Sequence, residues 1–168
     1  MPTYFSTNNN IVILQKINEV STTQKHELGT IITAADRDST AYGTGEFIYL
    51  KGVDNTVAGS VVLYQEDDYS TKLIVSGDVG TMAVAMASTV FNTFGWYQIK
   101  GKAIIRVAAG FADNSNCYLN ATAGTLSNTV SSTNYVFSIK GASAIGAVGA
   151  GLAEAELNRP FTTGLSTF

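Results

Sequence analysis

The feature that most constrains this chain is a succession of apolar runs that are only three to five residues long. Such runs are rich in β-branched and aromatic side chains, which is typical of strands, and they are too short for ordinary helices. They lie at Ile11–Leu14, Ile31–Thr33, Phe47–Leu50, Val61–Tyr64, Leu73–Val75, Trp96–Ile99, Ile104–Val107 and Tyr135–Ile139. Clusters of turn-forming residues, such as Gly52–Asn55 and Asp113–Asn116, separate them. The sequence therefore predicts an all-β fold, an antiparallel β-sandwich or barrel with extended terminal arms.

The sequence allows one segment, Met86–Phe94, to form a short helix. Met86, Val90 and Phe94 recur at a spacing of four residues, which places them on one helical face. Serine and threonine residues within Met86–Phe94 have low helix propensity. At most one short helix is therefore expected.

Three of the runs are followed by the same dipeptide, Lys51-Gly52, Lys100-Gly101 and Lys140-Gly141. A duplicated repeat would explain the similarity, but the separations of the three dipeptides are unequal. We interpret the dipeptide as a strand stop, in which glycine turns the chain and lysine keeps the strand edge solvated.

The length of 168 residues supports one self-sufficient core. We predict an N-terminal arm over residues 1–20, a single β domain over residues 21–160 and a C-terminal tail over residues 161–168.

The charge balance argues against two classes of partner. Ten Lys and Arg residues against 13 Asp and Glu residues give a net charge of −3, without the basic excess that nucleic-acid binding requires. The uncharged stretch Val79–Ile99 contains several Ser, Thr, Asn and Gln residues and does not have the composition of a membrane span. The first residues lack the basic and apolar blocks of a signal peptide, so we expect synthesis and retention in a cytoplasm.

Residues that could carry chemistry are sparse. A single cysteine, Cys117, cannot close an intramolecular disulfide, and a single histidine, His26, cannot form a His cluster. The acidic turn that begins at Asp36 lacks the glycine and the final carboxylate of a calcium loop. The Gly141–Gly146 segment lacks the lysine of a phosphate-binding loop. We therefore predict no catalytic residue, no metal site and no cofactor.

The stretch Asn114–Ile139 contains no charged residue and is dominated by Asn, Ser, Thr, Ala and Gly. A polar surface of low charge suits a protein that lies against other proteins, and an ordinary threonine-rich β surface has the same composition. Aromatic residues near both ends, Tyr4, Phe5, Phe161 and Phe168, need a place to bury. They either fold back on their own domain or reach a neighbouring molecule as arms.

Several longer segments carry a family resemblance. They are Gly43–Val53, Ala58–Val62, Met82–Ala87, Gly95–Gly101 and Gly151–Pro160. Together they resemble the head decoration, or capsid cement, proteins of tailed bacteriophages. The resemblance covers roughly Leu28 to Pro160, and its most specific blocks are Gly-Glu-Phe-Ile-Tyr-Leu-Lys-Gly and Gly-Trp-Tyr-Gln-Ile-Lys-Gly.

The resemblance implies a β-rich virion protein, made in the host bacterial cytoplasm, that binds the outer surface of the assembled head. It would bridge major capsid proteins of adjoining capsomers and stabilise the DNA-filled capsid through binding free energy. The family has no catalytic motif, so the resemblance implies no enzyme. A homotrimer is favoured over a dimer, because three capsomers meet at three-fold positions.

Large aromatic residues dominate binding energy at interfaces, so we expect the capsid or subunit interface to include six of them. They are Tyr4, Phe5, Trp96, Tyr97, Phe161 and Phe168. Because Trp96 and Tyr97 are adjacent on a strand, one is expected in the core and the other at the rim. Two alternatives remain open, namely a head-fibre or tail-associated receptor-binding β domain and an enzyme on a trimeric β scaffold.

Overall fold

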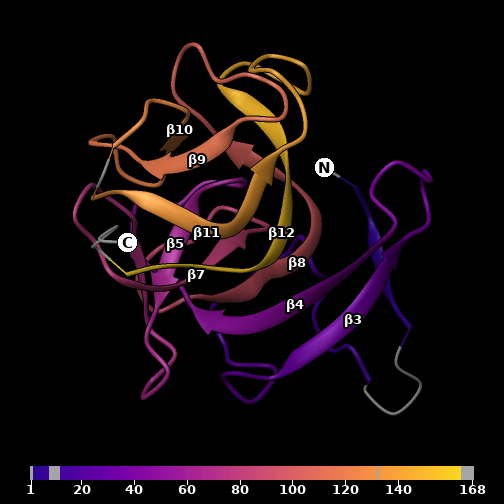
Figure 1. Ribbon diagram of the computed structural model, residues 1–168. Helices are drawn as coiled ribbons and strands as arrows, with labels where there is room; N and C mark the ends of the chain where they lie inside the picture. Colours follow the sequence, from indigo (N-terminus) through magenta and orange to yellow (C-terminus); the bar gives the residue numbers. More distant parts are fainter. Residues whose placement is uncertain (1, 8–11, 132, 164–168) are drawn as a thin grey trace.

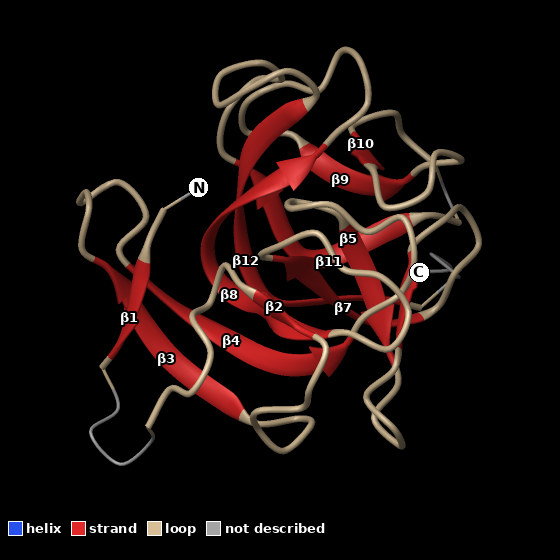
Figure 2. Cartoon of the chain, turned by 180° about the vertical axis from the view of Figure 1, so that it is seen from behind, coloured by secondary structure: helices blue, strands red, loops and turns tan. Residues whose placement is uncertain are grey.

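The computed structural model describes residues 2–7, 12–131 and 133–163. Twelve strands form one antiparallel sheet, and the described residues contain no helix (Figure 2). The strands are β1 (Tyr4–Ser6), β2 (Val20–Ser21), β3 (Ile31–Asp36), β4 (Thr44–Lys51), β5 (Val61–Tyr64), β6 (Thr71–Leu73), β7 (Gly80–Ala85), β8 (Phe94–Arg106), β9 (Asn116–Leu119), β10 (Leu126–Ser127), β11 (Tyr135–Gly141) and β12 (Leu152–Thr162). The all-β prediction is confirmed. No helix in the described part of the chain has the length and hydrophobicity of a membrane span.

The main path of the sheet runs β1-β3-β4-β8-β7-β12-β11-β9-β10, with β5 and β6 continuing from β7 and β2 pairing with β8. Figure 1 shows two parts, a wing that contains β3 and β4 and a strongly curled part that contains β5, β7 and β9–β12. Loop hydrogen bonds draw the ends of the curled part together. Val61 N–H donates to Gly124 O at 3.0 Å, and Ala108 N–H donates to Leu126 O at 2.8 Å. The sheet remains open but is barrel-like here.

Three groups of buried side chains fill the fold. The barrel core lies inside the curled part and includes Val84, Ile105, Cys117, Leu119, Val136, Ile139 and Leu157. The wing core contains Tyr4, Ile17, Ile32, Ala34, Phe47, Tyr49, Met86 and Trp96. The central core contains Ile48, Leu50, Val62, Ala83, Ala85, Tyr97 and Ile99. Neighbouring residues of β4 and β8 therefore enter different cores, because both faces of these strands are covered.

The core-and-rim prediction for the two adjacent aromatics is wrong. Trp96 is 1% exposed and Tyr97 is 0% exposed, so both are core residues. Trp96 and Tyr97 do point to opposite faces of β8, as adjacent residues of a strand should. The error lies in the assumption that one face of β8 meets solvent, whereas the wing core covers one face and the central core covers the other.

The segment that the sequence allows as a short helix is not helical, because residues 86–93 form a loop between β7 and β8, and this agrees with the expectation of at most one short helix. Thr93 Oγ1 donates to Val90 O at 2.7 Å and accepts from Val90 N–H at 3.1 Å. Asn92 has a φ of 60°, in the left-handed region. Side-chain hydrogen bonds of this kind give the backbone an alternative to the helical ladder.

The strand predicted at Ile11–Leu14 is wrong for residues 12–14, and Ile11 lies outside the described residues. Here side chains satisfy the backbone instead of a neighbouring strand, since Leu14 N–H donates to His26 Nε2 at 3.2 Å. The run Leu73–Val75 contributes only its first residue to β6.

The strand stops are confirmed at two of the three dipeptides, because β4 ends at Lys51 and β11 ends at Gly141. The prediction is wrong at Gly101, which lies inside β8 with a φ of 97°. Two predicted strands, Trp96–Ile99 and Ile104–Val107, are therefore largely one long strand. Near Gly101, β8 exchanges β4 for β12 as its partner, and the left-handed backbone there bends the strand.

Candidate interaction surfaces

The N-terminal aromatics fold back on the chain's own domain over the described residues. β1 pairs with β3, and Tyr4 lies opposite Asp36 in that pairing. The Tyr4 ring is 6% exposed and packs against Phe47 with centroids 4.6 Å apart. Burial, reinforced by the Asp36 charge, raises the pKa of Tyr4 above its usual range. Phe5 points away from the core, is 48% exposed and lies under the Arg37 guanidinium at 5.7 Å.

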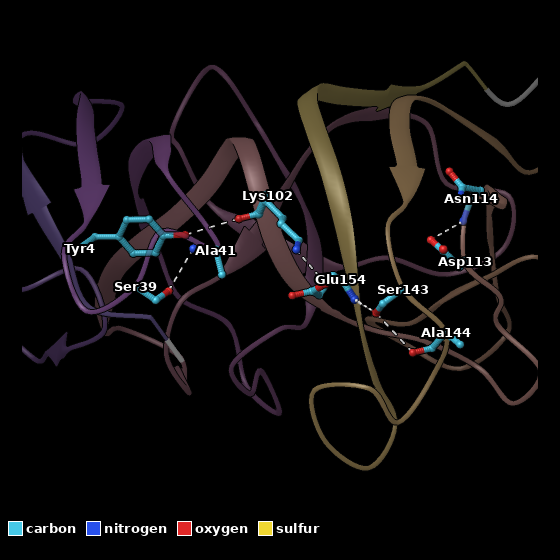
Figure 3. Close-up of polar contacts among 9 residues, drawn as sticks. All are labelled: Tyr4, Ser39, Ala41, Lys102, Asp113, Asn114, Ser143, Ala144 and Glu154. Atoms are coloured by element: carbon cyan, nitrogen blue, oxygen red, sulfur yellow. Dashed lines mark hydrogen bonds and ion pairs between the residues drawn. The ribbon is translucent and has the colours of Figure 1, made fainter.

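Two hydrogen-bonded contacts of Lys102 link this N-terminal strand to the rest of the sheet. Tyr4 Oη donates to Lys102 O at 3.4 Å, and Lys102 Nζ lies 2.9 Å from Glu154 Oε2 (Figure 3). β1 is thus connected through β8 to β12. Tyr4 is part of the folded domain and leaves only Phe5 of this pair available to a partner.

The other predicted interface residues differ in how far they are buried. Trp96 Nε1 donates to Gln15 O at 3.0 Å, and Tyr97 Oη lies 3.0 Å from Thr89 Oγ1. Both side chains are enclosed and present no surface to a partner. Phe161 belongs to β12 rather than to a tail, is 37% exposed and stacks on Phe137 at 5.1 Å. Phe168 lies outside the described residues.

A surface that the sequence did not indicate is formed by loops 52–58 and 86–93, which we call the apolar loop pair. Its exposed apolar residues are Val57 at 39%, Val90 at 54% and Phe91 at 65% exposure. Lys51 Nζ lies 5.9 Å from the Phe91 ring centroid, within reach of a cation–π contact. The Phe-Asn-Thr sequence at Phe91 was the one local signal, because Asn and Thr favour turns.

Hydrogen bonds hold the two loops together. Phe91 N–H donates to Asp54 Oδ1 at 2.8 Å, and Thr89 N–H donates to Thr56 O at 3.1 Å. Gly52 N–H donates to Thr93 O at 2.7 Å. A Cβ at Gly52 would lie 2.7 Å from Thr89 Cβ, so the loops approach as closely as glycine allows. The loop pair presents its apolar side chains on a fixed backbone.

A cluster of charged side chains joins β4, β8 and β12. Glu46 lies 2.8 Å from Arg159 Nη2 and 3.3 Å from Lys100 Nζ. The hydrogen bond from Arg159 is the main cause that lowers the pKa of the Glu46 carboxyl. These pairs are mostly exposed and contribute little to stability individually. They orient the three strands at the point where β12 changes partner.

The acidic turn uses its carboxylate internally. Asp36 Oδ1 accepts from Asp38 N–H at 3.1 Å, and Asp36 Oδ2 accepts from the Ser39 hydroxyl at 2.8 Å. Over residues 2–7, 12–131 and 133–163, no group of three or more His, Cys, Asp or Glu side chains could hold a metal ion.

The one cysteine and the one histidine belong to separate regions. Cys117 lies in the barrel core, where burial raises the pKa of its thiol to about 12. His26 packs against Tyr49 and Trp96 of the wing core at 5.2 and 5.0 Å. A thiol with a raised pKa is a poor nucleophile.

The pH dependence of stability is expected to report on His26. Burial lowers the pKa of His26 in the folded state. The folded state therefore binds fewer protons than the unfolded chain, whose histidine has a pKa of about 6.5. The free energy of unfolding should therefore be greatest above that pH and should fall as the pH drops toward the lower folded-state pKa. Protonation also removes the acceptor for Leu14 N–H. Urea denaturation from neutral to mildly acidic pH measures the effect.

The matched control is His26→Gln, which cannot titrate. Its free energy of unfolding should depend less on pH than that of the wild type over the same window. Equal pH dependence in the two proteins would assign the slope to other groups.

Comparison with known proteins leaves the chain without a family assignment, since no protein-family model and no curated protein matches it.

Proposed function

We propose that this chain is a non-enzymatic structural protein of a tailed-bacteriophage head. It binds the outer surface of the assembled head and bridges major capsid proteins, which stabilises the DNA-filled capsid. The proposal combines the sequence resemblance with one structural observation, the apolar loop pair. Its three exposed apolar residues are presented on loops that hydrogen bonds between the two loops already hold in place.

A preformed apolar surface suits a protein whose role is to add binding energy. Little conformational entropy is lost when an already ordered loop docks, so more of the contact energy becomes affinity. An exposed aromatic such as Phe91 is the kind of residue that dominates an interface when a partner encloses it. Binding the assembled lattice but not free capsid subunits stabilises the lattice by mass action at each occupied site.

A trimer is the assembly that we favour for this role. A closed three-fold oligomer placed where three capsomers meet would present three identical loop pairs to three identical surroundings. Linked sites of this kind bind more tightly than one site alone.

The proposal predicts that recombinant protein binds expanded, DNA-filled heads that lack it and raises the temperature at which they release DNA. Phe91→Ala is expected to weaken binding by about 10- to 30-fold, since truncation of an interface anchor costs roughly 1.4–2 kcal/mol. Co-sedimentation measures binding, and a dye-accessibility melt measures DNA release.

Val130→Ala is the matched control, because Val130 is also apolar and is 81% exposed but lies outside the loop pair. It should bind as the wild type does. If wild-type protein neither binds heads nor delays DNA release, the proposed function is wrong. If the wild type binds and Phe91→Ala binds equally well, the function stands and the loop pair is not the contact surface. Cryo-electron microscopy would separate density across capsomer seams from density on a fibre.

A further inference from the structure

A row of four aromatic rings crosses the outward face of β9, β11 and β12. Tyr118 meets Tyr135 with ring centroids 5.5 Å apart, Tyr135 meets Phe137 at 4.8 Å, and Phe137 stacks on Phe161 at 5.1 Å. The neighbouring residues Cys117 and Val136 point into the barrel core. Three strands that are distant in sequence thus bring their outward aromatics into one continuous row.

The row is partly open to solvent. Tyr118 at one end is 8% exposed, Phe161 at the other end is 37% exposed, and the two central rings are half-buried. The row therefore presents partly exposed aromatic rings to solvent from Tyr135 to Phe161.

A polar hollow adjoins the row at a bulge in β11. The register between β11 and both of its neighbours shifts around Ser138, which has a φ of 59°. Beyond the bulge the outward residues change from aromatic to polar. A hollow of about 420 Å³ is lined by Tyr135 together with Asn116, Ser138, Ile139, Lys140, Glu156, Leu157 and Asn158.

A second hollow of about 730 Å³ continues from the first along β12. The two share Glu156, Leu157 and Asn158, and the second extends to Glu46, Lys100 and Lys102. Both volumes lie within the range of roughly 300–1,000 Å³ that is usual for ligand sites. Together they form a groove with the Tyr135 ring at one end and amide, hydroxyl and charged side chains along its length.

We propose that this groove binds an oligosaccharide. A pyranose ring has an apolar face of C–H bonds, which packs on an aromatic ring, and a rim of hydroxyls, which needs hydrogen-bond partners. Tyr135 supplies the ring, while Asn116, Ser138 and Asn158 supply amide and hydroxyl groups at the same hollow.

The charge pattern favours an uncharged sugar chain over other ligands. Lys140 lies directly opposite Glu156 in the β11–β12 pairing, so positive and negative groups alternate across the hollow. A polyanion would be repelled by the Glu156 carboxylate. A protein partner is also less suitable, because the centre of a protein interface is usually depleted in charged residues. Neutral hydroxyls can donate to the carboxylate and accept from the ammonium group. This inference is independent of the proposed role at the capsid, and its test uses the free protein.

The test is titration of the intact, isotope-labelled chain with chitohexaose, cellohexaose and maltohexaose, followed by amide chemical shifts and calorimetry. We expect saturable binding of at least one hexasaccharide, with shifts concentrated at the bulge around Ser138. Tyr135→Ala and Asn158→Ala should each weaken that binding about tenfold or more. Phe91→Ala, which removes an exposed aromatic from the loop pair, should leave it unchanged.

Three results would overturn the proposal. The first is the absence of saturation by any of the three sugars at millimolar concentration. The second is unchanged affinity in Asn158→Ala, whose exposed side chain can be removed without disturbing the core, together with unchanged affinity in Tyr135→Ala if that variant folds. The third is loss of self-association or head binding in these variants without any sugar binding by the wild type, which would make the row a protein interface.

Discussion

Trp96→Ala is expected to lower the free energy of unfolding by about 3–5 kcal/mol, the usual cost of deleting a buried tryptophan side chain. The ring is 1% exposed and packs against Tyr49 with centroids 4.9 Å apart. Its Nε1–H also donates to Gln15 O, so the substitution leaves that carbonyl without its partner and loosens the N-terminal segment from the wing core. The total stability of a domain is only about 5–15 kcal/mol, so the variant should be close to unfolding at room temperature.

Urea denaturation followed by far-ultraviolet circular dichroism measures this loss. Fluorescence is unsuitable because Trp96 is the single tryptophan in the chain. Trp96→Phe keeps most of the ring volume but removes the donor, so it should lose less stability than Trp96→Ala. Phe91→Ala removes an aromatic that is 65% exposed and should change stability by only about 0.5 kcal/mol. A loss below about 1 kcal/mol in Trp96→Ala would show that the wing core does not depend on this ring.

Gly101→Ala should lower the free energy of unfolding by about 2–5 kcal/mol, because two costs add. The backbone φ of 97° lies where side chains are rarely tolerated. An added Cβ would also lie 2.7 Å from Thr44 O and 3.1 Å from Gly45 Cα, which are both backbone atoms of β4. Backbone cannot move aside as a flexible side chain can, so β4 and β8 must separate where β8 changes partner.

Gly43→Ala is the matched control for backbone conformation. Gly43 also has a positive φ, of 59°, but an added Cβ there would meet no atom within 4 Å. This variant should lose only the stability that the unfavourable backbone conformation costs, about 1–2 kcal/mol. Chemical denaturation of the two variants side by side measures the difference, which isolates the close approach of β4 to β8. Equal losses in both variants would mean that the close approach costs nothing.

Much of the fold could be predicted from local sequence, and the errors arise where partners outside the local segment decide its structure. The run Val61–Tyr64 coincides with β5, and the runs Phe47–Leu50 and Tyr135–Ile139 lie within β4 and β11. The helix that the spacing allowed at Met86–Phe94 does not form, because threonine side chains bond to the loop backbone and to the loop's neighbours. Spacing alone cannot reveal those partners.

The candidate interaction surfaces were less predictable than the fold. Aromatic character selected Phe5 and Phe161, which are partly exposed, and it also selected Tyr4, Trp96 and Tyr97, which are buried. The same side chain stabilises a core or an interface, so residue type does not decide between them. Phe91 was missed because its exposure depends on contacts between loops 52–58 and 86–93, which are separated by three strands and their connections.

By itself, the sequence determined that this chain forms short strands joined by tight turns, because strand propensity and turn chemistry act over a few neighbouring residues. Tertiary structure alone decided which strand faces are covered, where β8 and β12 exchange partners, and which side chains gather at the surface. The row from Tyr118 to Phe161 shows why: its rings come from β9, β11 and β12, and their proximity arises from strand pairing between distant segments. Burial depends on everything that packs around a residue, and that information is not local to the residue or to its run.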